Sequence, residues 1–266
     1  MYTDSHYHPF DLSHFLPQAE EERRRLGIIA AASSCDIDEF EYIERLMLDT
    51  TAPPLVPCFA IHPQQLAFWE EEKNKGKAEN LLLKLEKLAL EKRITAVGEC
   101  GFDLYSEKFK ATEKQQDEVF AAHLEIALTH DLPVVLHVRR ALHKIFSLSK
   151  QLARCKAVVF HSWPGTFEEG LALLRRKVNV YFSFGNTILN GHKQAMHCCS
   201  LFPAERLLTE TDAPYQPQRG KSFSAWEDLP VIINAAATLR REAASPIADT
   251  TELETRIEEN FRNVFF

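Results

Sequence analysis

The chain has 266 residues, of which 45% are hydrophobic and 26% are charged, and its formal net charge at pH 7 is -7. This length and composition exclude a disordered chain and predict a globular protein with a large buried core. The acidic balance argues against a broad basic surface for long duplex nucleic acid, but it leaves open a strand end held by a local basic cluster, a small phosphate ester or an uncharged substrate.

The lack of a recognisable targeting signal and the pattern of cysteines both favour the cytoplasm. No run of about 18 apolar residues predicts a membrane span, and the amino terminus has no basic region followed by an apolar segment. The six cysteines are scattered, form no C-x-x-C pair and lie mostly in apolar segments, which is typical of reduced, buried thiols. We therefore expect a cytoplasmic protein without membrane contact, and we see no sign of an obligate protein partner.

Short β-like segments alternate with longer amphipathic helical segments along the whole chain. The predicted strands are residues 1–6, 27–33, 55–61, 95–100, 133–138, 157–162, 178–184 and 206–212. The predicted helices are residues 16–26, 38–48, 79–92, 113–130, 141–152, 167–176, 193–200, 228–242 and 251–266, and the polar segment 68–80 is expected to be a surface insertion. This alternation predicts a single-domain (β/α)8 TIM barrel over residues 1–266, although a doubly wound open sheet shares the pattern.

Residues that bind metals stand at the carboxyl ends of five predicted strands. They are His6 and His8 at the first strand, Glu99 at the fourth, His137 at the fifth, His161 at the sixth and Asp212 at the eighth. One such histidine is more often a hydrogen-bonded residue at the edge of a core, and one such carboxylate is often a helix cap. However, the carboxyl ends of barrel strands converge on one mouth, where six such groups would be costly to desolvate without a cation. The pattern therefore predicts a metal site.

Imidazole and carboxylate ligands suit Zn, Mn, Fe or Co, and a carboxylate such as Glu99 can bridge two ions. Six ligands indicate two divalent metal ions, which would activate a water molecule for hydrolysis. A nucleophilic triad finds less support, because no G-x-S-x-G motif occurs and Cys100 lacks the usual partners. Neither a P-loop nor a G-x-G-x-x-G motif is present.

Several segments, taken in order, resemble a known family. The segments "TDSHYH", "CFAIHPQ", "VGECGFD", "LPVVLHVRRA", "VFHSW" and "RLLTETDAPY" are similar to those of the TatD-like metal-dependent deoxyribonucleases of the amidohydrolase superfamily, with a weaker likeness at "ENFRNVF". The resemblance implies a (β/α)8 barrel that holds its metals with the same six residues. It also implies hydrolysis of phosphodiester bonds in DNA, often from a strand end, with a divalent metal such as Mg, Mn or Zn.

The resemblance implies roles for individual residues as well. Asp212 would bind one metal and orient or deprotonate the attacking water, and Glu99 would bridge the ions, so both are predicted to be catalytic. Asp4 is expected to orient a neighbouring histidine, and Asp103 and Glu210 to support ligands or substrate.

Two further residues are predicted to contact the substrate. His62 would face the mouth and touch a phosphate or protonate a leaving oxygen. Arg139 would pair with phosphate through its planar guanidinium, the alternative being a salt bridge on the barrel rim.

The sequence departs from the family pattern at three places. The family commonly shows "HCFSG" after the sixth strand, whereas this chain has "HSWPG" from His161, which alters the loop over the pocket. After "TDAPY" the family's Asn-x-Pro is replaced by "AWEDLP". His123 stands where a glutamine is usual, which we interpret as a packing difference.

Together these observations favour a metal-dependent hydrolase of DNA phosphodiester bonds, acting on single-stranded or terminal DNA, because a narrow barrel mouth does not admit an intact duplex. A barrel amidohydrolase that cleaves a small-molecule amide, lactone or phosphoester is the alternative, since activated water attacks any suitably polarised centre. A metal-binding protein without turnover is the third possibility.

Overall fold

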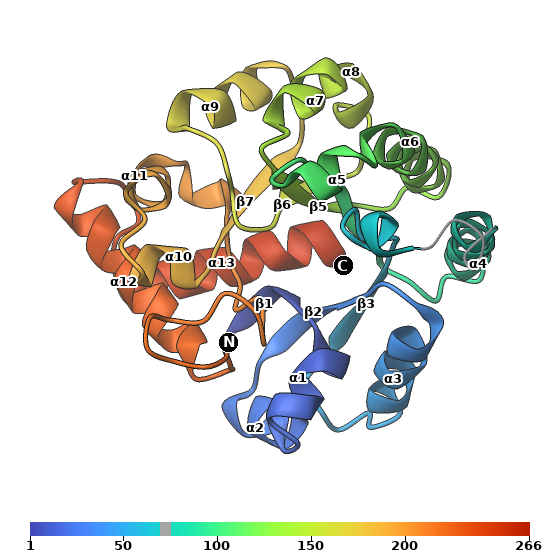
Figure 1. The fold of residues 1–266 in the computed structure, drawn as a ribbon. Helices are drawn as coiled ribbons and strands as arrows, with labels where there is room; N and C mark the ends of the chain where they lie inside the picture. Colours follow the sequence, from blue (N-terminus) through green and yellow to red (C-terminus); the bar gives the residue numbers. More distant parts are fainter. Residues whose placement is uncertain (70–75) are drawn as a thin grey trace.

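The computed structural model describes residues 1–69 and 76–266, so part of the predicted surface insertion 68–80 lies outside the described residues. Eight parallel strands pair in chain order and form a nearly closed barrel (Figure 1). The strands are β1 (Thr3–Tyr7), β2 (Ile29–Ser34), β3 (Leu55–Phe59), β4 (Ala96–Asp103), β5 (Val134–Arg139), β6 (Val158–Phe160), β7 (Val180–Phe184) and β8 (Leu207–Thr209). The predicted (β/α)8 fold class is confirmed, and the open-sheet alternative is not.

Helices surround the barrel on its outside (Figure 1). They are α1 (Pro9–Phe15), α2 (Ala19–Leu26), α3 (Ile37–Met47), α4 (Lys77–Leu90), α5 (Glu107–Lys110), α6 (Glu113–Thr129), α7 (Leu142–Ser147), α8 (Ser149–Leu152), α9 (Phe167–Arg175), α10 (Asn186–Leu189), α11 (Lys193–Leu201), α12 (Asp228–Glu242) and α13 (Thr250–Phe265), with short 3-10 turns η1 (Gln65–Phe68) and η2 (Ala204–Arg206). All predicted helices are present, although segment 141–152 is divided between α7 and α8. None of the helices in the described part of the chain is long and apolar enough to cross a membrane.

Apolar side chains fill one part of the barrel interior, and polar side chains lie at the carboxyl ends of the strands. Small and branched side chains of the strands, together with the ring of Tyr181, form one buried cluster: Ile29, Ala31, Val56, Cys58, Ala96, Val135, Ala157, Val159, Tyr181 and Leu208. Phe261, Val264 and Phe265 of α13 join this cluster, and α13 lies across the barrel (Figure 1). Because strand side chains alternate between faces, the inward Val135 places His137 on the same inner face, nearer the carboxyl end.

The seam between β8 and β1 brings the two ends of the sequence together. The Asp212 backbone N–H donates to the His6 carbonyl (3.0 Å), and the His8 N–H donates to the Ala213 carbonyl (2.8 Å). These two bonds hold the backbone of Asp212 and Ala213 against the end of the first strand. The structure therefore joins, at one place, the histidine pair and the acid that lie about 200 positions apart in the sequence.

Candidate metal centre

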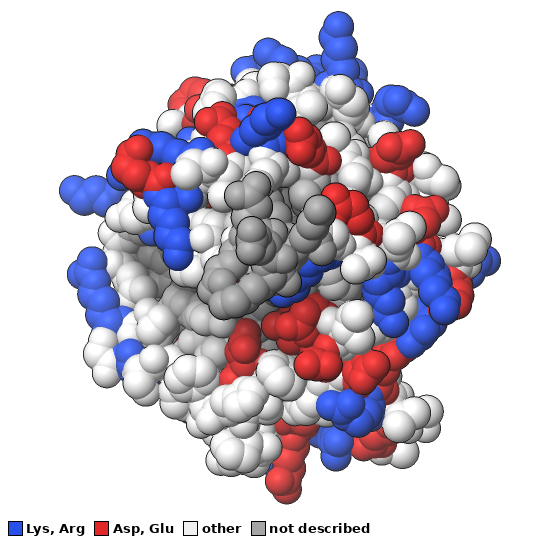
Figure 2. Space-filling model, turned by 45° about the vertical axis from the view of Figure 1, so that its right-hand side comes forward, with Lys and Arg blue, Asp and Glu red and all other residues white. Residues whose placement is uncertain are grey.

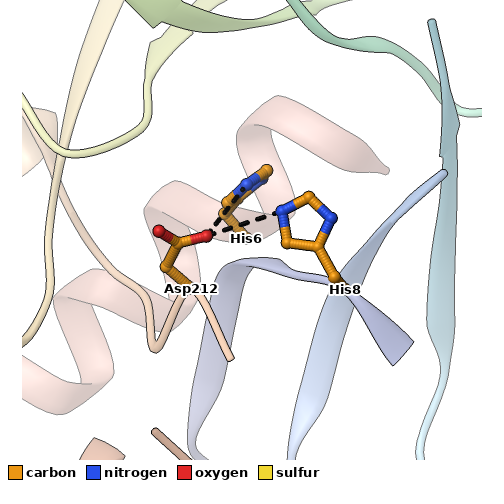
Figure 3. A group of neighbouring side chains, drawn as sticks. All are labelled: His6, His8 and Asp212. Carbon is orange, nitrogen blue, oxygen red and sulfur yellow. Dashed lines mark ion pairs between the residues drawn. The ribbon is translucent and has the colours of Figure 1, made fainter. Parts of the chain in front are cut away.

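The six predicted metal-binding residues converge at the carboxyl end of the barrel. Figure 3 shows His6 and His8 pointing toward the carboxylate of Asp212. The Nε2 atoms of both histidines lie 3.5 Å from Asp212 Oδ1. His6 belongs to β1, His8 follows it directly as the residue before α1, and Asp212 lies three residues after β8.

Glu99 lies at the centre of the cluster and presents one oxygen to each half of it. Its Oε2 is 3.1 Å from His6 Nε2 and 3.4 Å from His8 Nε2. Its Oε1 is 2.8 Å from His137 Nδ1 and 3.1 Å from His161 Nε2. Each oxygen of the carboxylate therefore faces at least two imidazoles, as a bridging ligand would, and the rings of His6 and His161 lie next to each other with centroids 4.3 Å apart.

The position of Glu99 within its strand differs from the prediction. The sequence predicts a strand that ends at residue 100 with Glu99 near its end, whereas β4 continues to Asp103. The register between β4 and β5 shifts between Val97 and Cys100, and such irregularities turn a side chain toward a site. Gly98 permits this close approach, because a Cβ there would lie 2.6 Å from the Cβ of Val135.

The electrostatics of the cluster show what a cation would replace. Burial alone would raise the pKa of Glu99, but the charges of His62 and His161 hold that pKa well below its usual range. Burial alone would lower the pKa of His8, but hydrogen bonds to Asp212 and Glu99 raise it to about 10. Protons on buried imidazoles thus balance buried carboxylates, and a divalent cation can take over this role.

The donor set fits such a cation on geometric grounds as well. Among the described residues, three groups have all their ligand atoms within 4.8 Å of one another: His6, His8 and Asp212; His6, Glu99 and His161; and His62, Glu99 and His137. His6 Nε2 is buried and makes no hydrogen bond of good geometry, although Glu99 Oε2 lies 3.1 Å away, while its Nδ1 lies 3.1 Å from Ser33 Oγ. An unpartnered ring nitrogen that faces carboxylates is ready to bind a metal.

Buried polar residues behind the cluster fix its members. Asp103 is fully buried, and its Oδ2 lies 3.1 Å from His137 Nε2 and accepts from Gln64 Nε2 at 2.7 Å. Asp4 accepts from the backbone N–H of His6 rather than from its ring. The ring of His6 is held by Ser33, which sequence reasoning missed.

Two residues lie near the rim, where substrate would enter. His62 Nε2 is 3.3 Å from Glu99 Oε1, so His62 reaches the cluster. Arg139 is exposed, and its Cζ lies 3.6 Å from the ring centroid of Tyr105 rather than in a salt bridge with another described residue. The adjacent Arg140 lies 4.6 Å from the same centroid.

His123 is a packing residue, as interpreted from the sequence. It is fully buried in α6, and its Nε2 accepts the backbone N–H of Ile61 at 3.1 Å. Burial lowers the pKa of His123 to about 3, so its ring stays neutral and can act as an acceptor. Cys198 and Cys199 are likewise free thiols buried in α11.

Comparisons with known proteins identify a family and relatives for this chain. The family model described as "TatD related DNase" matches residues 3–266. The 3'-5' ssDNA/RNA exonuclease TatD of Pantoea vagans is 33% identical over 213 residues, covering 77% of this chain and 75% of the relative. The Escherichia coli K12 exonuclease of the same name is 28% identical over 205 residues, covering 74% of each chain.

Two solved structures share the fold. The TatD homologue YJJV from Escherichia coli has a TM-score of 0.82 at 22% identity and covers 99% of this chain and 97% of its own. A TatD family hydrolase from Entamoeba histolytica has a TM-score of 0.74 at 21% identity, with 100% and 98% covered. From the family match over nearly its whole length, the chain belongs to the TatD-related DNase family of hydrolases.

Proposed function

We propose that this protein is a metal-dependent hydrolase that cleaves phosphodiester bonds of DNA, acting on a single strand or a strand end. The observation that carries the proposal is the carboxylate of Glu99, buried between imidazole groups that face each of its oxygens. Relatives at 28 to 33% identity are named as exonucleases of single-stranded DNA and RNA. The proposal assigns this activity to one barrel domain over residues 1–266.

Two divalent ions would share Glu99. His6, His8 and Asp212 form one group of donors, and His137 and His161 face the other oxygen of Glu99, Oε1. When bound, such ions lower the pKa of a water molecule and offset the charge of the phosphate. The imidazole-rich donor set suits Zn or Mn, while Mg is the remaining candidate.

Asp212 is the proposed acceptor of the proton from the attacking water. Burial alone would raise the pKa of Asp212, but the charge of His161 and a hydrogen bond from His8 lower it, so the carboxylate is ionised at neutral pH. Glu99 is the second proposed catalytic residue because it joins both halves of the site. Asp103 would hold His137 in place through the 3.1 Å contact, and His62 would touch the phosphate or the leaving oxygen.

Arg139 is the proposed phosphate contact on the rim. Its neighbour Arg140 and the exposed ring of Tyr105 form, with Arg139, a local basic and aromatic surface beside His137. Proteins that bind single-stranded nucleic acid use arginine side chains to contact phosphates and exposed aromatic side chains to stack on bases. Figure 2 shows acidic and basic side chains interspersed over the face it displays. Because a long duplex needs many basic contacts to its phosphates, this surface fits a short segment of single-stranded DNA better.

The test begins with chelated protein reloaded with Mn²⁺ or Zn²⁺. Its substrates are linear single-stranded DNA, circular single-stranded DNA, duplex DNA and a simple lactone. We expect metal-dependent cleavage of linear single strands that disappears in Asp212→Asn and persists in the control Asp117→Asn, whose carboxylate binds Lys144 on the outer surface. Turnover of the lactone but not of DNA, or metal binding without turnover, would contradict the proposal. A cytoplasmic location and the absence of an obligate partner stay predictions.

A further inference from the structure

The carboxamide of Gln216 contacts the proposed catalytic acid directly. Gln216 Nε2 lies 2.7 Å from Asp212 Oδ2 and 2.9 Å from Ser162 Oγ. Gln216 belongs to the loop after β8, and Ser162 to the loop after β6. An ionised carboxylate can only accept hydrogen bonds, so the amide nitrogen, not the amide oxygen, must face Asp212.

Ser162 extends this contact to a second carboxylate. Its hydroxyl donates to Glu210 Oε1 at 2.8 Å, and its backbone N–H donates to the same oxygen at 2.7 Å. The hydroxyl can also accept a hydrogen bond from Gln216 Nε2. The amide of Gln216 thus donates both to Asp212 and to Ser162, and Ser162 in turn donates to Glu210. Each of these buried carboxylates, which lie two residues apart in the sequence, thereby accepts a side-chain hydrogen bond at one oxygen.

The same contact decides which oxygen of Asp212 faces the metal-binding histidines. Oδ1 lies 3.5 Å from both His6 Nε2 and His8 Nε2, whereas Oδ2 is occupied by Gln216. A carboxylate held at one oxygen cannot rotate freely about its last bond, so the other oxygen stays aimed at the centre.

The backbone at these three residues is also unusual. Ser162 has φ 45°, Gln216 has φ 49° and Asp212 has φ 53°, all in the left-handed region. Residues other than glycine adopt this region at an energetic cost and persist there when surrounding contacts hold them. The side chains of these three residues are hydrogen-bonded to one another, through Gln216.

We propose that Gln216 is a positioning residue that orients the Asp212 carboxylate toward the metal centre, and that Ser162 holds Gln216 in place. The inference rests on the proposed role of Asp212 as a metal ligand and proton acceptor. It also gives a role to a residue of the "HSWPG" segment, where this chain departs from the pattern common in its family.

The test compares Gln216→Leu with Gln218→Leu, a matched change in the same loop. The carboxamide of Gln218 donates to Asp228 Oδ1 at 2.8 Å, so Gln218→Leu also removes an amide-to-carboxylate bond but leaves Asp212 untouched. The first measurement is Mn²⁺ binding to metal-free protein by calorimetry, with thermal unfolding of the same samples. The second is kcat and KM on a single-stranded oligonucleotide.

For Gln216→Leu we expect Mn²⁺ affinity to fall about 10- to 100-fold, the range found when a group that orients a metal ligand is removed. We expect kcat to fall with KM nearly unchanged, and Gln218→Leu to bind Mn²⁺ like the wild type. In Mn²⁺ affinity, Ser162→Ala should add little to Gln216→Leu, because the proposal has Ser162 act on Asp212 through Gln216.

Two results would overturn the inference. One is Mn²⁺ affinity and kcat in Gln216→Leu equal to those of the wild type. The other is an equal loss in Gln218→Leu, which would assign the effect to the loop rather than to Asp212. With either result, the proposed function still stands if the wild-type protein binds metal and cleaves DNA. A wild-type protein that binds no metal would contradict both the inference about Gln216 and the proposed function.

Discussion

Replacing Glu99 with glutamine tests the bridging arrangement with the smallest possible change in shape. The side chain keeps its volume but loses its charge, and an amide nitrogen replaces one of the two oxygens that face the imidazoles. The Glu99 carboxylate and a bound cation would form a buried ion pair, and removing one member of such a pair costs about 3–5 kcal/mol. At about 1.4 kcal/mol per factor of ten, this corresponds to a loss of roughly 100- to 5,000-fold in metal affinity.

Because Glu99 Oε2 faces His6 and His8 while Oε1 faces His137 and His161, the loss should affect both halves of the site. Calorimetric titration of metal-free Glu99→Gln with Mn²⁺ should therefore show weakened binding of both ions, not of one. The matched control is Glu86→Gln, which removes a glutamate 2.8 Å from His130 on the outer surface and should leave binding unchanged. One site weakened while the other keeps wild-type affinity would refute the bridging role.

Two further predictions concern substrate and pH. Arg139→Ala should raise KM for single-stranded DNA several-fold and leave kcat unchanged. In fluorescence anisotropy, the plot of log affinity against log salt concentration should become less steep by about 0.7, and Arg25→Ala on α2, the control, should not change it. An unchanged steepness in Arg139→Ala would remove Arg139 from the phosphate contacts. The pKa of His123 is depressed in the folded state, from 6.5 to about 3, so the unfolded chain binds a proton first and stability is lost as pH falls below 6.5. The stability of His123→Gln relative to the wild type should therefore increase by about 2 to 3 kcal/mol between pH 7 and pH 4.5 in urea unfolding, and no change with pH would contradict a buried neutral ring.

The barrel was predictable because each strand carries a strong local signal. Runs such as "PVVLHV" and "AVVFHS" are apolar, short and followed by polar residues, and they form β5 and β6 within a few residues of the predicted limits. Helices α1, α5 and α10 were missed because they have seven, four and four residues, too few for a helical period to show.

The candidate site was predictable only in its residue types and strand positions. Glu99 faces inward because the register of β4 shifts beside Gly98, and no periodicity in the sequence announces such a shift. Ser33 could have been found, since it is a polar residue closing the apolar segment "GIIAAAS". Ser162 and Gln216 could not, because they meet only when two loops distant in the sequence are folded onto the same mouth.

Anomalous scattering from crystals of the metal-loaded protein tests the central claim most directly. The account predicts two peaks at the carboxyl end of the barrel, one on each side of Glu99, the first among His6, His8 and Asp212 and the second beside His137 and His161. Peaks elsewhere on the molecule, or none in fully loaded and folded protein, would contradict it.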